Sequence, residues 1–277
     1  MPTMPKWAVK QSMRDWINKA RRVGLRLTAS DFSAQQTILS KKKREIEALL
    51  TAKAEMASKS VPTPKPKKGK VAKRVVHHVI VADDSGSMRG ERQKAAHKGI
   101  VEYVKTAWNQ TTELDVQVYF HLLFFGSEIK EASFAITPGN IDNKLAEIYT
   151  CKQNSTRLND AIIAGIECVK NVPKTEQVFI VAFTDGEENA SRSTAVLTSQ
   201  AVKLAIAKGQ SISLFSGTSA GKTYAMSIGI DETNVLLVNN TQEGFTQGLF
   251  QATQSMKKQT AQYTASGTTF STGFYQS

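Results

Sequence analysis

Short apolar runs alternate with helical patterns of apolar and polar residues from Val75 to about Gln259. The apolar runs are rich in β-branched and aromatic residues, which is typical of strands buried on both faces. Apolar residues in the intervening segments recur three and four positions apart, which predicts helices. The predicted strands cover residues 75–82, 114–125, 131–136, 177–184, 211–215 and 235–238, and the predicted helices cover residues 92–108, 140–149, 158–169, 193–208 and 241–259.

This alternation predicts an α/β fold, a doubly wound and mostly parallel sheet with helices on both faces. Residues 131–136 follow Gly126-Ser127 and alternate in polarity, so we expect them to form one antiparallel edge strand. The predicted domain covers residues 75–259. Residues 260–277 are rich in Ser, Thr, Gly and Gln, and we expect them to form a flexible tail.

The residues before Val75 have a different pattern. Residues 5–27 and 30–58 each have a helical pattern, so we predict a basic helical arm, a two-helix hairpin, over residues 1–58. Residues 59–74 contain three prolines among lysines, which is typical of an extended linker.

The net charge of +12 is concentrated in this N-terminal part. Residues 1–74 carry 19 Lys and Arg against 5 Asp and Glu, whereas residues 75–277 carry 17 against 19. A basic amphipathic helix is typical of a membrane-surface helix, a nucleic-acid contact or a helix that docks on a partner, and its apolar face also packs on a neighbouring helix in many proteins. The linker has no aromatic residue for base stacking, so we expect only weak, salt-sensitive contact of residues 1–74 with nucleic acid or an anionic surface.

The cysteines and histidines have no spacing typical of a metal site. Cys151 and Cys168 form no C-x-x-C pair, and we expect free thiols in a reducing compartment. The four histidines, at positions 77, 78, 97 and 121, are expected to be structural or exposed. The first 27 residues have no apolar core of signal-peptide length, and no stretch is long and apolar enough for a membrane span, so we expect a cytoplasmic protein.

Candidate chemistry appears where the first predicted strand ends, in the segment Val79 to Met88, V-I-V-A-D-D-S-G-S-M. Asp83, Ser85 and Ser87 should leave the carboxyl end of a central strand, where ligands of open α/β sheets bind. One carboxylate and two hydroxyls form an all-oxygen set that suits Mg²⁺. Asp84 is expected to point away along the turn and to contribute little.

The pattern Asp83-x-Ser85-x-Ser87 resembles the metal-ion-dependent adhesion site of von Willebrand factor type A (VWA) domains. Thr184-Asp185-Gly186-Glu187 is similar to the segment that supplies the second acidic residue in that family. Ser155-Thr156-Arg157-Leu158 resembles the loop that supplies its threonine, although Asn154-Ser155 stands where glycine is common. The resemblance covers about residues 76–258 and implies a Rossmann-like VWA fold. By this resemblance the metal ligands are Asp83, Ser85, Ser87, Thr156 and Asp185.

The resemblance also implies a function. It implies Mg²⁺ as the ion, with Mn²⁺ or Ca²⁺ as alternatives, and an open position that a carboxylate of another protein fills. We therefore expect an adhesion or scaffold module that captures an Asp or Glu of a protein partner, and not an enzyme. In members of the family that switch conformation the last helix moves, and residues 241–259 are its counterpart here.

Two other classes stay open. The segment Ser216 to Thr223 follows a predicted strand and resembles a Walker A loop with serine in the place of the first glycine. A nucleotide-binding enzyme is therefore one alternative. A nucleic-acid-binding protein that uses the basic arm is the other.

Overall fold

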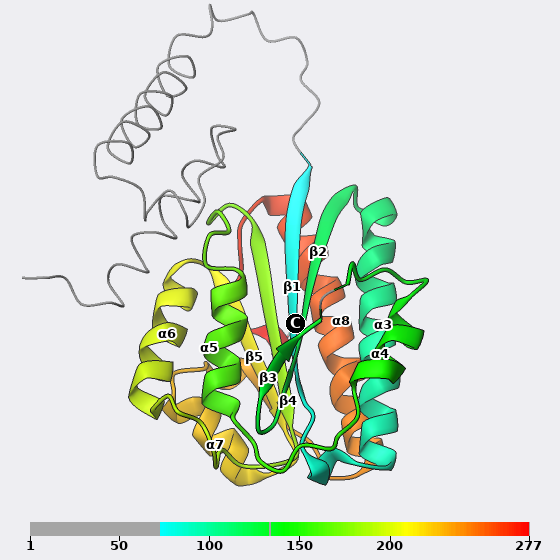
Figure 1. Cartoon of the computed structure of the whole chain (residues 1–277). Coiled ribbons are helices and arrows are strands. Elements are labelled where there is room, and N and C mark those ends of the chain that lie inside the picture. Colours follow the sequence, from blue (N-terminus) through cyan, green and yellow to red (C-terminus); the bar gives the residue numbers. More distant parts are fainter. Residues whose placement is uncertain (1–72, 133, 277) are drawn as a thin grey trace, which may run out of the picture. The chain divides into compact units, whose positions relative to one another are not determined.

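Six strands form one sheet in the computed structural model, in the order β3-β2-β1-β4-β5-β6 (Figure 1). The structure describes residues 73–132 and 134–276. The predicted arm over residues 1–58 and nearly all of the predicted linker lie outside these residues. The strands are β1 (Arg74–Asp83), β2 (Val116–Phe125), β3 (Ile129–Glu131), β4 (Gln177–Thr184), β5 (Gln210–Ser216) and β6 (Val235–Leu237).

All neighbouring strands pair in parallel except β2 and β3. This arrangement confirms the predicted α/β class with a single antiparallel edge strand. The centre of the sheet consists of β1 and β4, and every residue of β4 is buried. The apolar runs at residues 79–82 of β1 and 178–183 of β4 follow from this position, because a central strand of a doubly wound sheet is covered by helices on both sides.

The predicted position of the edge strand is wrong. Residues 131–136 were expected to form it, but β3 occupies Ile129–Glu131. The backbone N–H of Gly126 donates to the carbonyl of Glu128 over 3.0 Å, which closes the turn early. Pairing with β2 therefore begins at Phe125 opposite Ile129 and ends at Leu123 opposite Glu131. The turn geometry, and not the polar alternation farther along, sets the register.

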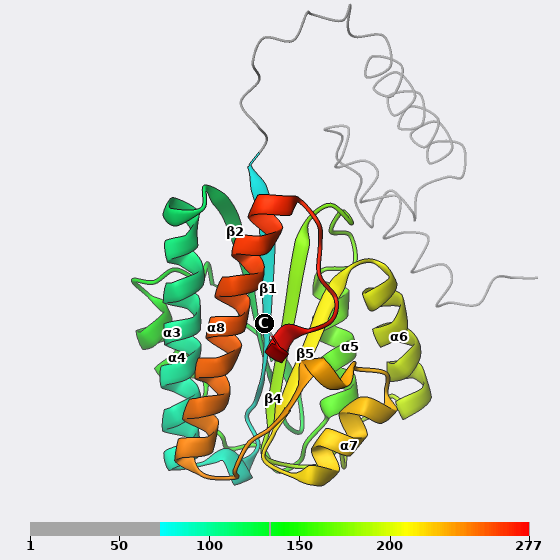
Figure 2. The same ribbon diagram turned by 180° about the vertical axis from the view of Figure 1, so that it is seen from behind.

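Six helices cover the two faces of the sheet (Figure 1 and Figure 2). One face packs against α3 (Glu91–Glu113), α4 (Ile141–Ile148) and α8 (Gln242–Ser266), and the other against α5 (Leu158–Cys168), α6 (Ala195–Ala207) and α7 (Ser219–Ser227). Alternate residues of β1 serve the two cores: Ile80 and Ala82 pack with the α3 side, Val79 and Val81 with the α5 side. Within the described residues, no helix has the length and apolar character to cross a membrane.

The contact between α3 and α8 depends on a residue without a side chain. A Cβ atom added to Gly99 of α3 would lie 2.4 Å from Cδ1 of Leu249 of α8, too close for any real contact. The side chain of Leu249 is buried in this gap. The two helices can approach closely here only because position 99 is glycine.

The described part of the C-terminal segment, residues 260–276, forms the end of a helix and a turn packed on the core, which corrects the prediction of a flexible tail over residues 260–277. Helix α8 continues past Gln259 to Ser266 and ends at Gly267, whose φ of 72° is left-handed. The following residues return across the sheet to a short 3₁₀ turn, η4 (Phe274–Gln276), where Phe274 is fully buried. The composition of this segment is polar, but its few aromatic residues have enough apolar surface to hold it on the core.

Candidate functional site

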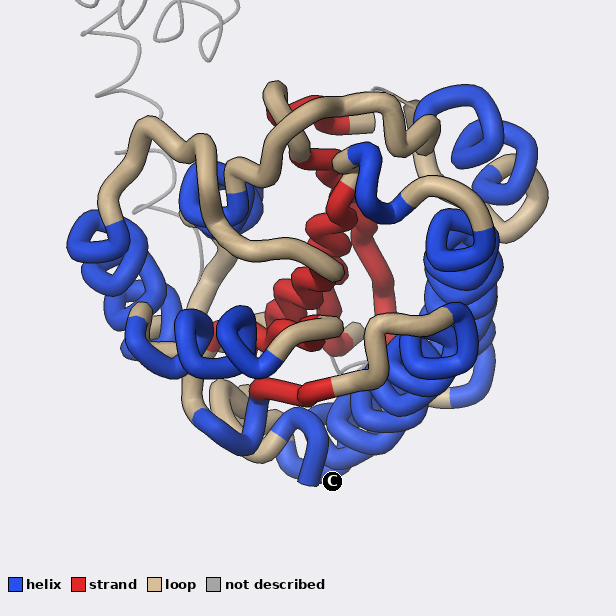
Figure 3. The backbone as a smooth tube through the Cα atoms, turned by 90° about the horizontal axis from the view of Figure 1, so that it is seen from below, coloured by secondary structure: helices blue, strands red, loops and turns tan. Residues whose placement is uncertain are grey.

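Three loops meet at the carboxyl edge of the sheet, which Figure 3 views from below. They follow β1, precede α5 and follow β4. Ser85 forms a parallel bridge with Gln153, and the N–H of Gly86 donates to the carbonyl of Gln153 over 2.7 Å. The N–H of Asn189 donates to the carbonyl of Thr156 over 3.1 Å. These backbone bonds bring together segments that are about 70 and 30 residues apart in the chain.

Asp83 is the last residue of β1 and is fully buried. Its carboxylate accepts hydrogen bonds from the backbone N–H of Ser85, over 2.8 Å, and from the hydroxyl of Thr184 at the end of β4. Burial raises the pKa of Asp83 to about 6, the hydrogen bonds from Ser85 and Thr184 partly oppose that rise, and the nearby charge of Asp185 adds to it. The side chain is therefore held in one orientation but is unfavourably charged near neutral pH.

A chain of short hydrogen bonds connects three of the predicted residues, Ser85, Ser87 and Asp185. The hydroxyls of Ser85 and Ser87 lie 2.9 Å apart. Ser87 Oγ in turn donates to Asp185 Oδ1 over 2.7 Å. Gly86 and Ser87 belong to a short 3₁₀ turn, η2 (Gly86–Met88), and the Ser87 hydroxyl of this turn reaches the loop after β4 through Asp185.

The second carboxylate oxygen of Asp185 is buried and has no hydrogen-bond partner among the described residues. Within the part of the chain that the structure describes, the cation beside it is the guanidinium of Arg92, whose Nη1 lies 3.2 Å from Oδ2. Arg92 comes from the first turn of α3 and also donates to the carbonyl of Ser87 and to Asn240 Oδ1. A buried carboxylate oxygen without a hydrogen bond is costly unless a cation compensates it.

Thr156 lies beside the same loop. It is 4% exposed, and its backbone N–H donates to Asn189 Oδ1 over 2.9 Å. A Cβ atom added to Gly186 would lie 3.3 Å from Thr156 Oγ1, so the hydroxyl is close to the backbone that follows Asp185. The structure thus brings all five predicted residues to one edge of the sheet, four of them through the hydrogen bonds described above.

The expectation that Asp84 contributes little is wrong. The residue is 2% exposed, and its carboxylate accepts from the backbone N–H groups of Thr150 and Cys151 and from the side chain of Gln153. It therefore fixes the loop that precedes Thr156. Asp84 makes no hydrogen bond to the hydroxyl chain, as expected, but its carboxylate is the acceptor for these three donors of the loop.

The donors of this site fit a hard divalent cation. They comprise two carboxylates and three hydroxyls, and Asp185 Oδ2 is an acceptor that has no hydrogen bond in the described residues and is compensated there by the ion pair with Arg92. Two buried carboxylates near one another repel unless a positive charge lies between them or one is protonated. An all-oxygen set with two anionic members is the type of ligand that Mg²⁺ and Ca²⁺ prefer.

Residues that sequence reasoning missed complete the site. The hydroxyl of Tyr149 donates to the carbonyl of Asp83 over 2.9 Å and fixes the backbone there. Thr184 orients the Asp83 carboxylate, Arg92 forms an ion pair with Asp185, and Asn240 accepts a hydrogen bond from Arg92. Thr184 adjoins Asp185 in sequence and so carried a signal. Arg92, Tyr149 and Asn240 carried none, because only the fold brings them close.

The segment that resembled a Walker A loop connects β5 to α7, a helix absent from our prediction. The side chain of Thr218 caps this helix by accepting from the N–H of Gly221 over 3.0 Å, and the N–H of Gly217 donates to the carbonyl of Thr184. Lys222 forms an exposed ion pair with Glu232. Amides of this loop that a phosphate would need are therefore already bonded within the protein.

Comparison with known proteins identifies the fold. No family model and no curated protein matches the sequence. Among solved structures, the chain is similar to the open pilus adhesin SpaC from Lactobacillus rhamnosus GG, with 15% identity, a TM-score of 0.54 and coverage of 68% of this chain and 30% of that one. It is also similar to a von Willebrand factor type A protein from Catenulispora acidiphila, with 12% identity, a TM-score of 0.51 and coverage of 69% and 43%.

A third similar structure is the PilB minor pilin from Streptococcus sanguinis, with 14% identity, a TM-score of 0.50 and coverage of 70% of this chain and 63% of that one. The first solved chains that it matches are longer proteins, of which the match spans 31% to 46%. These similarities show a VWA-like fold, as the sequence predicted. At these identities they do not extend to the ligands of a metal site.

Proposed function

We propose that this chain is a protein-binding module, which captures an Asp or Glu of a partner protein through Mg²⁺ held by Asp83, Ser85, Ser87, Thr156 and Asp185. The observation that carries the proposal is the buried Asp185 oxygen without a hydrogen bond, at the end of the hydroxyl chain. The VWA-like fold of adhesins and pilins supports a role in protein interaction.

The chemistry of the site supports Mg²⁺ as the ion, with Mn²⁺ or Ca²⁺ as alternatives. Three of the five donors are neutral hydroxyls, so a bound ion keeps positive charge with which to attract a partner's carboxylate. The protein's own residues prepare this binding. Thr184 and the backbone of Ser85 hold Asp83, while Ser87 holds Asp185.

Binding, and not turnover, agrees best with the hydrogen bonds. The hydroxyls of Ser85 and Ser87 bond to each other and to a carboxylate, so no imidazole activates either of them as a nucleophile. The internally bonded amides of the loop before α7 favour this reading over a nucleotide-binding enzyme.

The test is a selection of random peptides on the immobilised full-length chain in the presence of Mg²⁺, with elution by EDTA. We expect the eluted peptides to be enriched in Asp or Glu. Asp83→Asn should lose this enrichment, because the amide cannot supply the anionic ligand while it keeps the size of the side chain. The matched control is Asp142→Asn, which removes an exposed carboxylate on α4 and should leave the enrichment unchanged.

Isothermal titration with Mg²⁺ and Mn²⁺ on the same three proteins separates ion binding from partner binding. If the wild-type chain binds neither ion at millimolar concentration, even with an acidic peptide present, the proposal is wrong. If it binds an ion but the selected peptides are not acidic, the metal site stands and the capture of a carboxylate is wrong.

Two further parts of the proposal concern residues and settings beyond the site. The basic residues 1–74 would serve as a second, salt-sensitive attachment to a partner or an anionic surface. Filter binding to nucleic acid at low and moderate salt tests whether nucleic acid is such a surface, because binding by charge alone weakens as the salt concentration rises. Cys151 and Cys168 are both free thiols, which supports a cytoplasmic location.

A further inference from the structure

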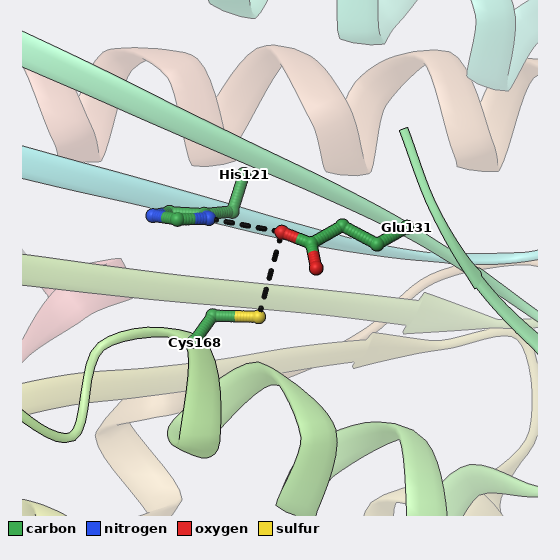
Figure 4. Close-up of side chains that lie close together, drawn as sticks. All are labelled: His121, Glu131 and Cys168. Atoms are coloured by element: carbon green, nitrogen blue, oxygen red, sulfur yellow. Dashed lines mark hydrogen bonds and ion pairs between the residues drawn. The ribbon is translucent and has the colours of Figure 1, made fainter. Parts of the chain in front are cut away.

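Away from the carboxyl edge, three side chains with metal-binding atoms converge on one point (Figure 4). His121 comes from β2, Glu131 ends β3, and Cys168 is the last residue of α5. His121 Nδ1 lies 3.2 Å from Glu131 Oε1, and Cys168 Sγ lies 3.8 Å from the same oxygen. All three ligand atoms lie within 4.8 Å of one another. We call these residues the sheet-face cluster.

Strand register brings the cluster together. Glu131 pairs with Leu123 across the antiparallel edge, so both side chains lie on the same face of the sheet. His121 is two residues before Leu123 on β2 and lies on that face as well. Helix α5 covers this face and ends at Cys168, opposite the pair. Three elements therefore meet here, although His121 and Cys168 are 47 residues apart in the chain.

We propose that His121, Glu131 and Cys168 bind Zn²⁺, with water in the fourth position. Zn²⁺ prefers this combination of imidazole nitrogen, carboxylate oxygen and thiolate sulfur in tetrahedral sites. The usual bond lengths to these ligands imply ligand-to-ligand distances of about 3.4 to 3.6 Å around a tetrahedral ion. The two short distances of the cluster, 3.2 and 3.8 Å, lie on either side of that range.

The exposure of the three residues suits a site that an ion can enter. The side chains of His121 and Glu131 are 29% and 52% exposed, and Cys168 is partly buried. The other cysteine, Cys151, is fully buried. The other three histidines bond elsewhere: His77 to Glu176, His78 to Tyr103 and His97 to Asp142. Only this part of the described chain joins a thiol and an imidazole.

The donor set also separates this cluster from the site at the carboxyl edge. That site offers oxygen atoms alone, which suit Mg²⁺, whereas sulfur and imidazole nitrogen select softer ions. The sheet-face cluster does not depend on the proposed capture of a carboxylate, and either proposal stands if the other fails.

The test uses Co²⁺ and Zn²⁺ on the full-length chain. An Asp83→Asn background removes the oxygen site as a competitor for the ions. Co²⁺ bound to a thiolate gives a sulfur-to-metal charge-transfer absorption, which neither oxygen ligands nor imidazole produce. We expect this band at one equivalent of Co²⁺ in the background protein and in Cys151→Ser, and we expect its loss in Cys168→Ser.

The affinity for Zn²⁺ tests the other two ligands by competition with a chromogenic chelator. Loss of an outer partner of a metal ligand typically weakens binding about 10- to 100-fold, so His121→Ala and Glu131→Gln should each weaken it at least tenfold. His97→Ala is the matched control and should have no effect. Cys168→Ala is a second variant without the thiol. Circular dichroism checks that each variant is folded.

Three results would overturn the proposal. One is the absence of a thiolate band in the background protein, which would leave the cluster as a set of hydrogen bonds only. Another is a band that survives both Cys168 substitutions. The third is unchanged Zn²⁺ affinity in folded His121→Ala or Glu131→Gln.

Discussion

The carboxyl-edge site and the sheet-face cluster are built in opposite ways. The first gathers buried oxygen atoms on loops that follow parallel strands, and Asp83 and Asp185 are 0% and 4% exposed. The second gathers three different elements on partly exposed positions of a strand pair and a helix end. The first is supported by a dense set of backbone bonds, whereas the second is connected by side-chain hydrogen bonds from His121 and Cys168 to Glu131.

This difference explains why only one of them is visible in the sequence. The carboxyl ends of the parallel strands in an α/β sheet lie at the same edge. Polar residues that directly follow those strands are therefore brought together by the fold itself. A cluster on a sheet face depends on the register of β2 with β3, and a shift of one residue would turn Glu131 to the opposite face. The first kind of site follows from the fold, and the second from a single pairing within it.

The largest expected effect is on stability. Asp84→Ala should lower the free energy of unfolding by about 3 kcal/mol or more, because it leaves two backbone N–H groups and the Gln153 amide without their buried acceptor. Glu131→Gln should cost less than about 1 kcal/mol without metal, because that carboxylate is half exposed. Urea unfolding of both variants in EDTA measures the difference. Equal losses would mean that the sheet-face cluster is as structural as the carboxyl edge.

An intermediate effect is expected from pH. Because burial raises the pKa of Asp83 to about 6 from an ordinary value of 3.8, the folded protein takes up a proton that the unfolded chain does not. The metal-free protein should therefore lose stability as the pH rises from about 4 through 6, by at most about 3 kcal/mol. Asp83→Asn should remove this loss and be the more stable protein at pH 7.5 in EDTA. Urea unfolding at pH 4.5 and 7.5 provides the measurement.

Asp160 is the matched control for this pH effect. Burial opposes its ionisation, but hydrogen bonds from Ser193, Arg192 and Arg157 prevail and lower its pKa to about 2. Its contribution is present above the unfolded value and is lost only as the pH falls toward 2. Asp160→Asn should thus differ from the wild type by the same amount at both pH values. A wild-type stability that does not fall toward pH 7.5 relative to Asp83→Asn would contradict the raised pKa.

The smallest expected effect concerns Arg92. Its guanidinium neutralises part of the Asp185 charge, so Arg92→Gln should raise the affinity for Mg²⁺ by about two- to fivefold, which corresponds to less than about 1 kcal/mol. Lys94→Gln, on the same helix but paired with Glu91, should leave the affinity unchanged. Titration calorimetry with Mg²⁺ measures both. A loss of Mg²⁺ binding in Arg92→Gln would show that the arginine supports the site and does not compete with the ion.

Much of the fold was predictable because its strands are strongly apolar. The limits of β4 agree with the prediction to the residue, since Gln177 and Thr184 enclose an uninterrupted apolar run. The prediction was wrong where a local contact outweighed composition. Phe274 holds a polar tail on the core, the turn after Gly126 sets the edge strand, and Thr218 caps α7, a helix that the prediction lacked.

The candidate site was predictable in its outline and not in its supports. Asp83, Ser85, Ser87, Thr156 and Asp185 lie together as the motifs predicted, but their role as metal ligands stays a prediction. The structural importance of Asp84 was missed because its partners, the N–H groups of Thr150 and Cys151, come from a distant loop. Hydrogen-bond partners that depend on tertiary packing leave no periodic signal in a sequence.

The close approach of Gly99 and Leu249 limits how α8 can move along α3. A side chain that sits in a gap left by a glycine resists small displacements, because any shift forces it against the neighbouring turn. The next equivalent position on a helix is one turn away, about 5.4 Å. Axial movement of α8 would therefore require Leu249 to leave this gap, because the residues one turn from Gly99 on α3, Ala95 and Tyr103, carry side chains and leave no equivalent gap.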